Sequence, residues 1–236
     1  MEIPDKLIAW AEGRDMTVRG HALLWDKDQN NPSWTWPLSQ TDFTQAVYKH
    51  VDQTLDHFDV LGVKHWDVIN EMVDQGRENH TFYVDHSGDP DIRAKIHRHV
   101  KERYPNTLFY VNDYGVINDN FNRFSLFQQL VRDLLAAGAP IDGLGLQSHL
   151  HGNDQCSGLL ETEFWGAGHD FLDWVKMKER LDTLWEEFQL PIWITEFDWN
   201  GDQTADFGDH SRHAEILDSF YRLTFSHQVG GRDMFY

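Results

Sequence analysis

The chain has 236 residues, 40% of them hydrophobic and 25% charged, which is the composition of a folded globular protein and excludes a disordered one. Its formal net charge of -19 argues against a nucleic acid or an anionic membrane surface as partner, because both are bound by basic patches. No stretch approaches the roughly 20 consecutive apolar residues of a membrane-spanning helix, so we expect no membrane partner. A neutral polysaccharide is compatible with an acidic surface, and the 10 Trp residues favour sugar binding, because sugar rings stack on aromatic side chains.

Apolar residues at helical spacing alternate along the chain with short β-rich runs. The spacing predicts helices over residues 4–13, 41–61, 89–104, 119–137, 171–188 and 210–226. The β-rich runs predict strands over residues 17–24, 65–70, 108–112, 142–147 and 192–195. A strand–helix alternation of this kind is typical of a parallel sheet covered by helices.

The number of predicted strands sets the expected fold. An eight-stranded barrel takes about 250 residues, and five predicted strands with their helices already occupy this chain. We therefore expect an α/β fold, a (β/α)8 TIM barrel that is incomplete in this chain, with two or three strands outside it. No Pro-rich or Ser-rich linker divides residues 1–236, so we expect a single domain. The loop over residues 150–170 is unusually long, and loops of that size are often functional.

Polar and aromatic residues gather where the predicted strands end. All strands of such a barrel end at one face, which is where barrel enzymes keep their active sites. Two of the strand ends carry a glutamate, Glu71 in one and Glu196 in the other. Glycoside hydrolysis requires two such carboxylates: one protonates the leaving oxygen, and the other attacks or stabilises the anomeric carbon.

Other side chains at the strand ends fit the same chemistry. Asn70 precedes Glu71 and could hydrogen-bond a sugar 2-hydroxyl. Gln147 and His149 alternate along one strand, so both project to the same side. We expect His149 to hold the nearby glutamate ionised, and Asp198 to orient His149.

The strings RGHALLW, WDVINE, NDY, DGLGLQSH and WITEFD, in this order, resemble the motifs of glycoside hydrolase family 10, the xylanase family of the clan A barrels. The resemblance spans nearly the whole chain. It implies an endo-β-1,4-xylanase that hydrolyses internal β-1,4-xylosidic bonds of xylan by a retaining double-displacement mechanism. By this resemblance Glu71 is the general acid/base, Glu196 is the nucleophile and Asp198 supports the histidine. The residues expected to bind substrate are His21, Trp25, Asn70, Asn112, Tyr114, Gln147 and His149.

The chain also departs from the family pattern. Asp26 stands where the family usually has His, and Gly115 where it often has Asn, which could weaken a leaving-side subsite. The glycone-side residues of the family's first strands and the Trp residues of its last strand have no counterpart here, so the resemblance implies that the first strands and the last strand of the barrel are missing from this chain.

Two other functions therefore stay open. A retaining β-1,4-glucanase would share the fold and the carboxylates. A polysaccharide-binding barrel with little turnover is favoured slightly by Asp26, Gly115 and the long loop. Trp34 and Trp36 lie in a Pro-flanked loop, where sugar contact and loop packing are equally expected.

We expect no cofactor and no bound metal. The 14 His residues lack the spacing of metal ligands, and His80, His97 and His99 are expected to be surface residues. Cys156 is the only cysteine, so no intrachain disulfide can form. The expected partner is xylan or a related β-1,4-linked polysaccharide, and the expected state is a monomer. We expect an extracellular location from the family and its substrate, although residues 1–4 do not begin a signal peptide.

Overall fold

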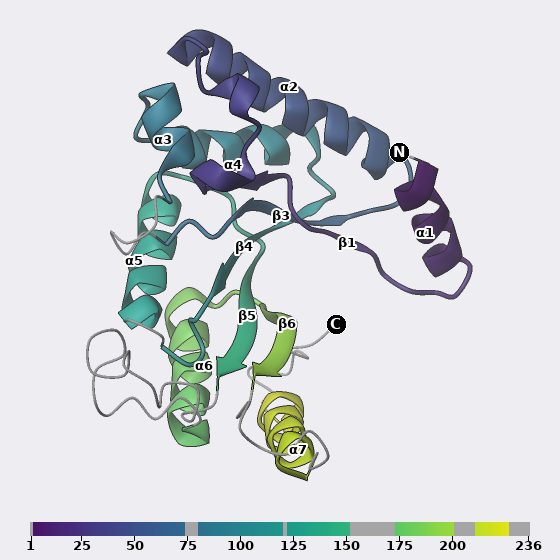
Figure 1. Ribbon diagram of the computed structural model, residues 1–236, viewed down its shortest axis with the longest axis vertical. Helices are drawn as coiled ribbons and strands as arrows, with labels where there is room; N and C mark the ends of the chain where they lie inside the picture. The colour runs from purple at the N-terminus through teal and green to yellow at the C-terminus, as the bar shows by residue number, and fades with distance from the viewer. Residues whose placement is uncertain (1, 74–79, 120–121, 152–172, 201–210, 227–236) are drawn as a thin grey trace. The chain divides into compact units, whose positions relative to one another are not determined.

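A computed structural model describes residues 2–73, 80–119, 122–151, 173–200 and 211–226, in which parallel strands alternate with α-helices (Figure 1). The strands are β1 (Arg19–Gly20), β2 (Leu24–Trp25), β3 (His65–Asn70), β4 (Leu108–Tyr114), β5 (Gly143–His151) and β6 (Ile192–Asn200). The α-helices are α1 (Glu2–Glu12), α2 (Gln40–Asp59), α3 (Phe82–Ser87), α4 (Ile92–Arg103), α5 (Arg123–Ala136), α6 (Trp174–Phe188) and α7 (Ser211–Ser226). The predicted alternation of parallel strands and helices is confirmed. Among the described helices, none is long and apolar enough to cross a membrane.

The chain divides into two compact units. The first unit comprises Met1–Asn112 and Gln129–Gly143, and the second comprises Asp113–Gln128 and Leu144–Tyr236. The expectation of one catalytic domain over residues 1–236 stays a prediction. The predicted loop over residues 150–170, with Cys156, lies almost entirely outside the described residues.

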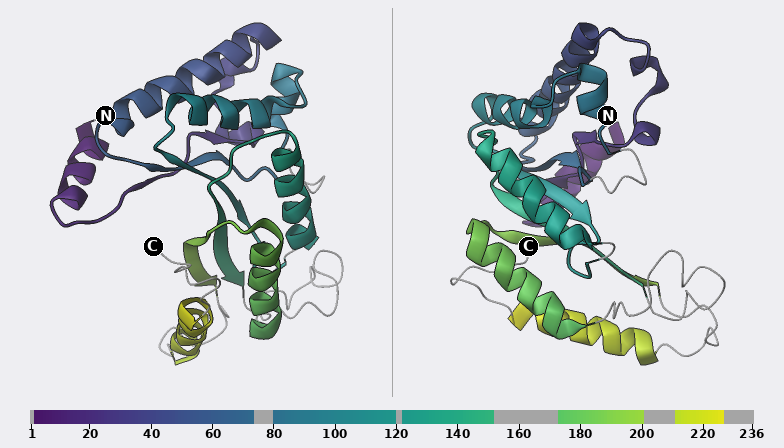
Figure 2. Two further views of the ribbon diagram at one scale, coloured as in Figure 1. Left: turned by 180° about the vertical axis from the view of Figure 1, so that it is seen from behind. Right: turned by 90° about the vertical axis from the view of Figure 1, so that its left-hand side faces the viewer.

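In the first unit, β3 is the central strand. It pairs in parallel with β1, β2 and β4, and its last residue, Asn70, lies opposite both Trp25 and Asn112. Helices α2, α3 and α4 pack against one another, and α4 also packs against β3 (Figures 1 and 2). Helix α2 has a buried apolar stripe four residues apart, made of Phe43, Val47, Val51 and Leu55.

In the second unit, β5 and β6 pair in parallel over their whole length. The register places Gln147 opposite Glu196 and His149 opposite Asp198. Helices α6 and α7 pack against each other (Figure 2). Phe220 of α7 stacks on Phe197 of β6 with ring centroids 4.3 Å apart, which anchors the helix to the strand.

The structure differs from the sequence-based prediction in the bounds of several elements, most clearly at three places. The strand expected over residues 17–24 is split, because the register shifts by one residue between Gly20↔Trp66 and Leu24↔Ile69, and residues 21–23 bulge. Helix α3 was not predicted, since six residues are too few to show helical periodicity. Strands β5 and β6 continue to His151 and Asn200, beyond the predicted ends, because the two strands keep pairing there.

The close contact between Gly20 of β1 and Trp66 of β3 can be tested by substitution. A Cβ atom at this position would lie 2.2 Å from the ring of Trp66, which is buried. We expect Gly20→Ala to lower the free energy of unfolding by about 1–3 kcal/mol, because the buried ring must shift. Thermal unfolding measures the effect. The matched control is Gly13→Ala, where the nearest atom would be 3.5 Å from the new Cβ and the change should stay within about 0.5 kcal/mol. Equal melting temperatures for the two variants would contradict this packing.

Candidate active site

The backbone of Glu71 is held in an uncommon conformation directly after β3. Its φ of 56° lies in the left-handed region, which costs a residue with a side chain about 1–2 kcal/mol. Its N–H donates to the carbonyl oxygen of Asn112 at 2.9 Å, and its own carbonyl accepts from Nδ1 of His80 at 2.6 Å. Strained backbone that the surroundings enforce is concentrated at functional sites, so this residue is a candidate.

The carboxylate of Glu71 is buried, with 6% of the residue exposed, and both of its oxygens have partners. Nζ of Lys27 lies 3.0 Å from Oε2, and Nδ2 of Asn70 donates to Oε1 at 3.3 Å. Nδ2 of Asn112 donates to Oδ1 of Asn70 at 2.9 Å, and this bond fixes which end of the Asn70 amide faces the carboxylate. Asn70 and Asn112 are fully buried.

His21 and Trp25 lie on the strand run beside β3. Nδ1 of His21 is 2.9 Å from Oδ2 of Asp67, a buried carboxylate whose other oxygen binds Arg19. The ring of Trp25 is half-buried, with its centroid 6.1 Å from that of His21. Its backbone carbonyl accepts from Nδ2 of Asn31 at 2.7 Å. The parallel register therefore brings Trp25 to the same strand edge as Asn70 and Asn112.

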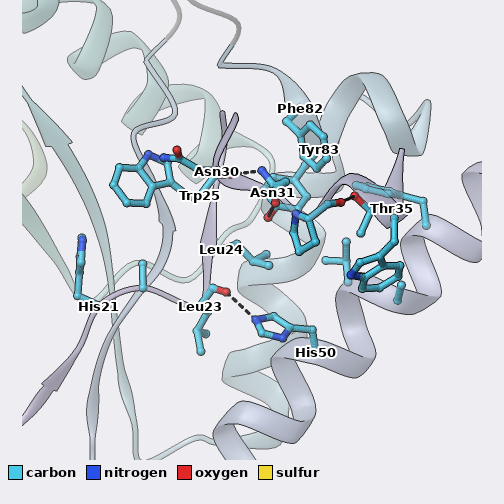
Figure 3. A pocket seen from close by; sticks show the side chains of 16 residues that line it. His21, Leu23, Leu24, Trp25, Asn30, Asn31, Thr35, His50, Phe82 and Tyr83 are labelled. Carbon is cyan, nitrogen blue, oxygen red and sulfur yellow. Dashed lines mark hydrogen bonds between the residues drawn. The ribbon is translucent and has the colours of Figure 1, made fainter. Parts of the chain in front are cut away.

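A cavity of about 370 Å³ adjoins His21 and Trp25 (Figure 3). It lies between residues 21–25, the loop that follows them, α2 and α3, and its lining is mainly apolar. His50 lines it but already contacts the carbonyl oxygen of Leu23 at 3.1 Å. None of the described residues that line the cavity is acidic, so it supplies no carboxylate for catalysis.

In the second unit, His149 lies between two carboxylates. Its Nε2 is 3.1 Å from Oε2 of Glu196, and its Nδ1 is 2.5 Å from Oδ2 of Asp198. The hydrogen bond to Glu196 is the largest of the influences that raise the pKa of His149 to about 9; burial opposes them and Asp198 adds to them. The imidazole is therefore a cation at neutral pH, and a cation at this distance favours the ionised form of Glu196.

Gln147 and Tyr114 are placed in the second unit by their strands. Gln147 is buried and lies opposite Glu196 in the β5–β6 register. The ring of Tyr114 is covered by the guanidinium of Arg123, whose Cζ is 3.6 Å from the ring centroid and which also pairs with buried Asp113. Gly115 has a φ of 66°, a region in which Gly and Asn are both favoured, so this departure from the family pattern keeps the backbone conformation.

The structure thus assigns each predicted site residue to one of the two units. The first unit holds His21, Trp25, Asn70, Glu71 and Asn112. The second holds Tyr114, Gln147, His149, Glu196 and Asp198. Trp34 and Trp36 are exposed, Trp34 by 62%, and Trp34 lines the cavity.

Sequence reasoning missed Lys27, and it was wrong about two histidines. The signal for Lys27 was its position two residues after Trp25, at a strand end. His80 and His97, expected at the surface, are buried, because neighbouring elements cover them. Burial lowers the pKa of His97 to about 4. Among the described residues, no group of three or more His, Cys, Asp or Glu side chains could hold a metal ion.

Comparison with known proteins adds a family assignment. The sequence profile of Glycosyl hydrolase family 10 matches residues 2–228. Endo-beta-1,4-xylanase Xyn10C of Cellvibrio japonicus is 30% identical over 155 residues, which are 62% of this chain and 25% of that protein. The chain thus spans about a quarter of the length of this curated relative.

Solved structures of two xylanases share the fold. A mutant of xylanase 10C from Cellvibrio japonicus in complex with xylopentaose has a TM-score of 0.66 at 25% identity, over 83% of this chain and 37% of that chain. The intracellular xylanase TsXylA of Thermoanaerobacterium saccharolyticum has a TM-score of 0.71 at 26% identity, over 94% of this chain and 65% of that chain. The fold is that of the (β/α)8 barrels of this family, and the chain holds part of such a barrel.

The charge state of His149 can be measured by NMR titration of its imidazole. We expect a midpoint near pH 9 in the parent protein and a lower midpoint in Asp198→Asn, because that variant loses one of the two carboxylates that favour the cation. Asp182→Asn is the matched control, since Asp182 lies on α6 and pairs with Lys178. A parent midpoint at the ordinary value of 6.5 would contradict the observed geometry.

The raised pKa of His149 also determines how the free energy of unfolding changes with pH. The folded state binds the His149 proton more tightly than the unfolded state, so its contribution to stability is full below about pH 6.5 and is lost as the pH rises through about 9. The difference in unfolding free energy between the parent and Asp198→Asn should therefore shrink from about pH 6 to about pH 10.

Proposed function

This chain belongs to glycosyl hydrolase family 10, and on that premise we propose that the protein is an endo-β-1,4-xylanase that hydrolyses internal bonds of xylan with net retention. The observation that carries the proposal is the contrast between its two strand-end glutamates. Glu71 is buried, has a left-handed backbone and contacts Lys27, whereas Glu196 is one-third exposed and pairs with the imidazolium of His149. An acid/base and a nucleophile need such different surroundings.

Glu196 is the proposed nucleophile. A nucleophile must be ionised when it attacks the anomeric carbon, and the imidazolium of His149 at 3.1 Å favours that state. Attack forms a covalent glycosyl-enzyme and expels the leaving sugar. Asp198 keeps the imidazole oriented through its other nitrogen, at 2.5 Å.

Glu71 is the proposed general acid/base. It donates a proton to the departing glycosidic oxygen, and then accepts one from the water that hydrolyses the glycosyl-enzyme. Nζ of Lys27, 3.0 Å from Oε2, and Nδ2 of Asn70 hold the orientation of this carboxyl group. Retention requires the two carboxyl groups to lie about 5–5.5 Å apart in the enzyme.

The remaining predicted residues are the proposed sugar contacts. Asn70 lies against the acid/base, where a bond to the sugar 2-hydroxyl would strengthen in the transition state. Asn112 is buried behind Asn70 and acts through it. His21, Trp25, Tyr114 and Gln147 are the other proposed contacts, and the xylopentaose bound to the related xylanase supports xylan as the substrate. A monomeric, extracellular enzyme is part of the same proposal.

The two alternative functions make different predictions. A β-1,4-glucanase would use the same carboxylates on another sugar. A binding barrel loses part of its support, because Asp26 is a well-partnered buried residue and Gly115 keeps a backbone conformation that Asn also adopts.

Activity assays on two polysaccharides separate these functions. We expect the protein to release reducing sugar from xylan faster than from carboxymethylcellulose. Glu196→Ala and Glu71→Ala should each lower xylan turnover by about 10³-fold or more, because each removes a group on which the double displacement depends. Glu179→Ala, which removes an exposed carboxylate of α6, is the matched control and should be unchanged.

Other outcomes would overturn parts of the proposal. Faster hydrolysis of carboxymethylcellulose would identify a glucanase. Xylan binding without sugar release in the parent protein would favour the binding barrel. A folded Glu196→Ala variant with full activity would reject the assigned nucleophile.

A further inference from the structure

We propose that Asp26, Arg93 and His80 form a positioning network that holds the backbone of Glu71 in its active geometry. The inference rests on the proposed role of Glu71 as the acid/base. Sequence analysis noted Asp26 only as a departure from the family pattern, and it gave Arg93 and His80 no place in the site.

Asp26 is the fixed end of this network. The residue is fully buried, and both of its carboxylate oxygens are bonded: Oδ2 to Nε of Arg93 at 2.7 Å and Oδ1 to the N–H of Tyr83 at 3.1 Å. Its own N–H donates to the carbonyl oxygen of Asn70 at 3.0 Å. Burial raises the pKa of Asp26, and Arg93 opposes that shift. A buried carboxylate depends on its partner cation, so the two side chains constrain each other.

Arg93 connects Asp26 to His80. It is the second residue of α4, and its guanidinium donates through Nε to Asp26 and through Nη2 to the backbone carbonyl of His80. His80 is buried, and its Nδ1 donates to the carbonyl oxygen of Glu71 at 2.6 Å. Hydrogen bonds joined through the residues Arg93 and His80 therefore connect Asp26 with the backbone carbonyl of Glu71.

Glu71 needs such support because its backbone is left-handed. The hydrogen bond to Asn112 fixes the peptide that precedes its Cα atom, and the hydrogen bond from His80 fixes the peptide that follows it. Without the second bond, the peptide can relax towards a commoner φ, and the carboxylate would swing with it. The network therefore sets the direction in which the acid delivers its proton.

The two neighbours of Asp26 in sequence are held by Asn31. Trp25 is a proposed sugar contact, and Lys27 pairs with the carboxylate of Glu71. Nδ2 of Asn31 donates to the carbonyl oxygens of both neighbours at 2.7 Å, and Oη of Tyr83 donates to Oδ1 of Asn31 at 2.8 Å. Asn31 thus links the residues on both sides of Asp26 to Tyr83, whose N–H donates to Asp26.

The test compares substrates that need the acid with substrates that do not. Xylotetraose has a sugar as its leaving group, which departs only when the acid protonates it. In 2,4-dinitrophenyl β-xylobioside the leaving group is a dinitrophenolate, which departs without protonation. We expect Arg93→Met to lower kcat for xylotetraose by about 30–100-fold, because an acid displaced by about 1 Å transfers its proton poorly. The glycosylation rate with the dinitrophenyl substrate should stay within about threefold.

A control variant on the same helix separates positioning from general stability. Lys101→Met also removes a cation of α4, but Lys101 pairs with Asp142, at 2.9 Å, and supports the start of β4 through the carbonyl of Thr107. We expect Lys101→Met to leave the ratio of the two rates unchanged. The double variant His80→Leu/Arg93→Met should lose no more activity than the more impaired of the two single variants, because both residues act along one path.

Three results would count against the network. Equal losses on both substrates in Arg93→Met would make Arg93 a structural residue only. Losses that multiply in the double variant would show two independent effects. A parent protein that turns over neither substrate would overturn the proposed function together with this inference. If Arg93→Met does not fold, the same two rates are compared in Asp26→Asn, because Asn has nearly the shape of the Asp26 side chain but lacks its negative charge.

Discussion

Parallel pairing of β3 with the strands on both of its sides is the constraint on which the candidate site depends. Because the strands run in one direction, their carboxyl ends meet at one edge, and Trp25, Asn70 and Asn112 become neighbours although they are far apart in sequence. Glu71 follows at that edge. Its N–H bonds to Asn112, so the end of β4 helps to set where the chain leaves β3. In the second unit, the parallel register of β5 and β6 likewise makes His149 a neighbour of Glu196 and Asp198.

The two proposed catalytic carboxylates each lie beside a cation, and the two cations are of different kinds. The chain carries a formal charge of -19, yet each proposed catalytic glutamate has a basic partner: Lys27 for Glu71 and His149 for Glu196. A lysine keeps its charge over the working pH range, whereas the histidine loses its proton through about pH 9. Alkaline pH should therefore affect the surroundings of Glu196 first.

The parts of the fold that sequence could predict are those that rest on local periodicity. Strand β3 is a continuous buried run and was predicted with its observed ends, and α2 shows its apolar stripe in the sequence. The bulge at residues 21–23 depends on pairing with β3, which no local pattern encodes. Arg93 reads as one charged residue among several on α4, and only the tertiary structure shows that it bonds to Asp26 and His80. From the sequence, Gly115 is only the loss of an Asn side chain that the family often has. Its φ of 66° shows that the backbone here is in a region that Asn also adopts.

The proposal that Glu196 is the nucleophile of a retaining hydrolase is tested most directly by trapping the glycosyl-enzyme. A 2-deoxy-2-fluoro β-xylobioside with a good leaving group reacts with a retaining enzyme and then hydrolyses slowly, so the covalent intermediate accumulates. We predict that peptide mass spectrometry of the inactivated protein will find the fluoroxylobiosyl group on Glu196, and that Glu196→Ala will carry none. The group on a different carboxylate, or no adduct in a protein that hydrolyses xylan, would contradict the proposal.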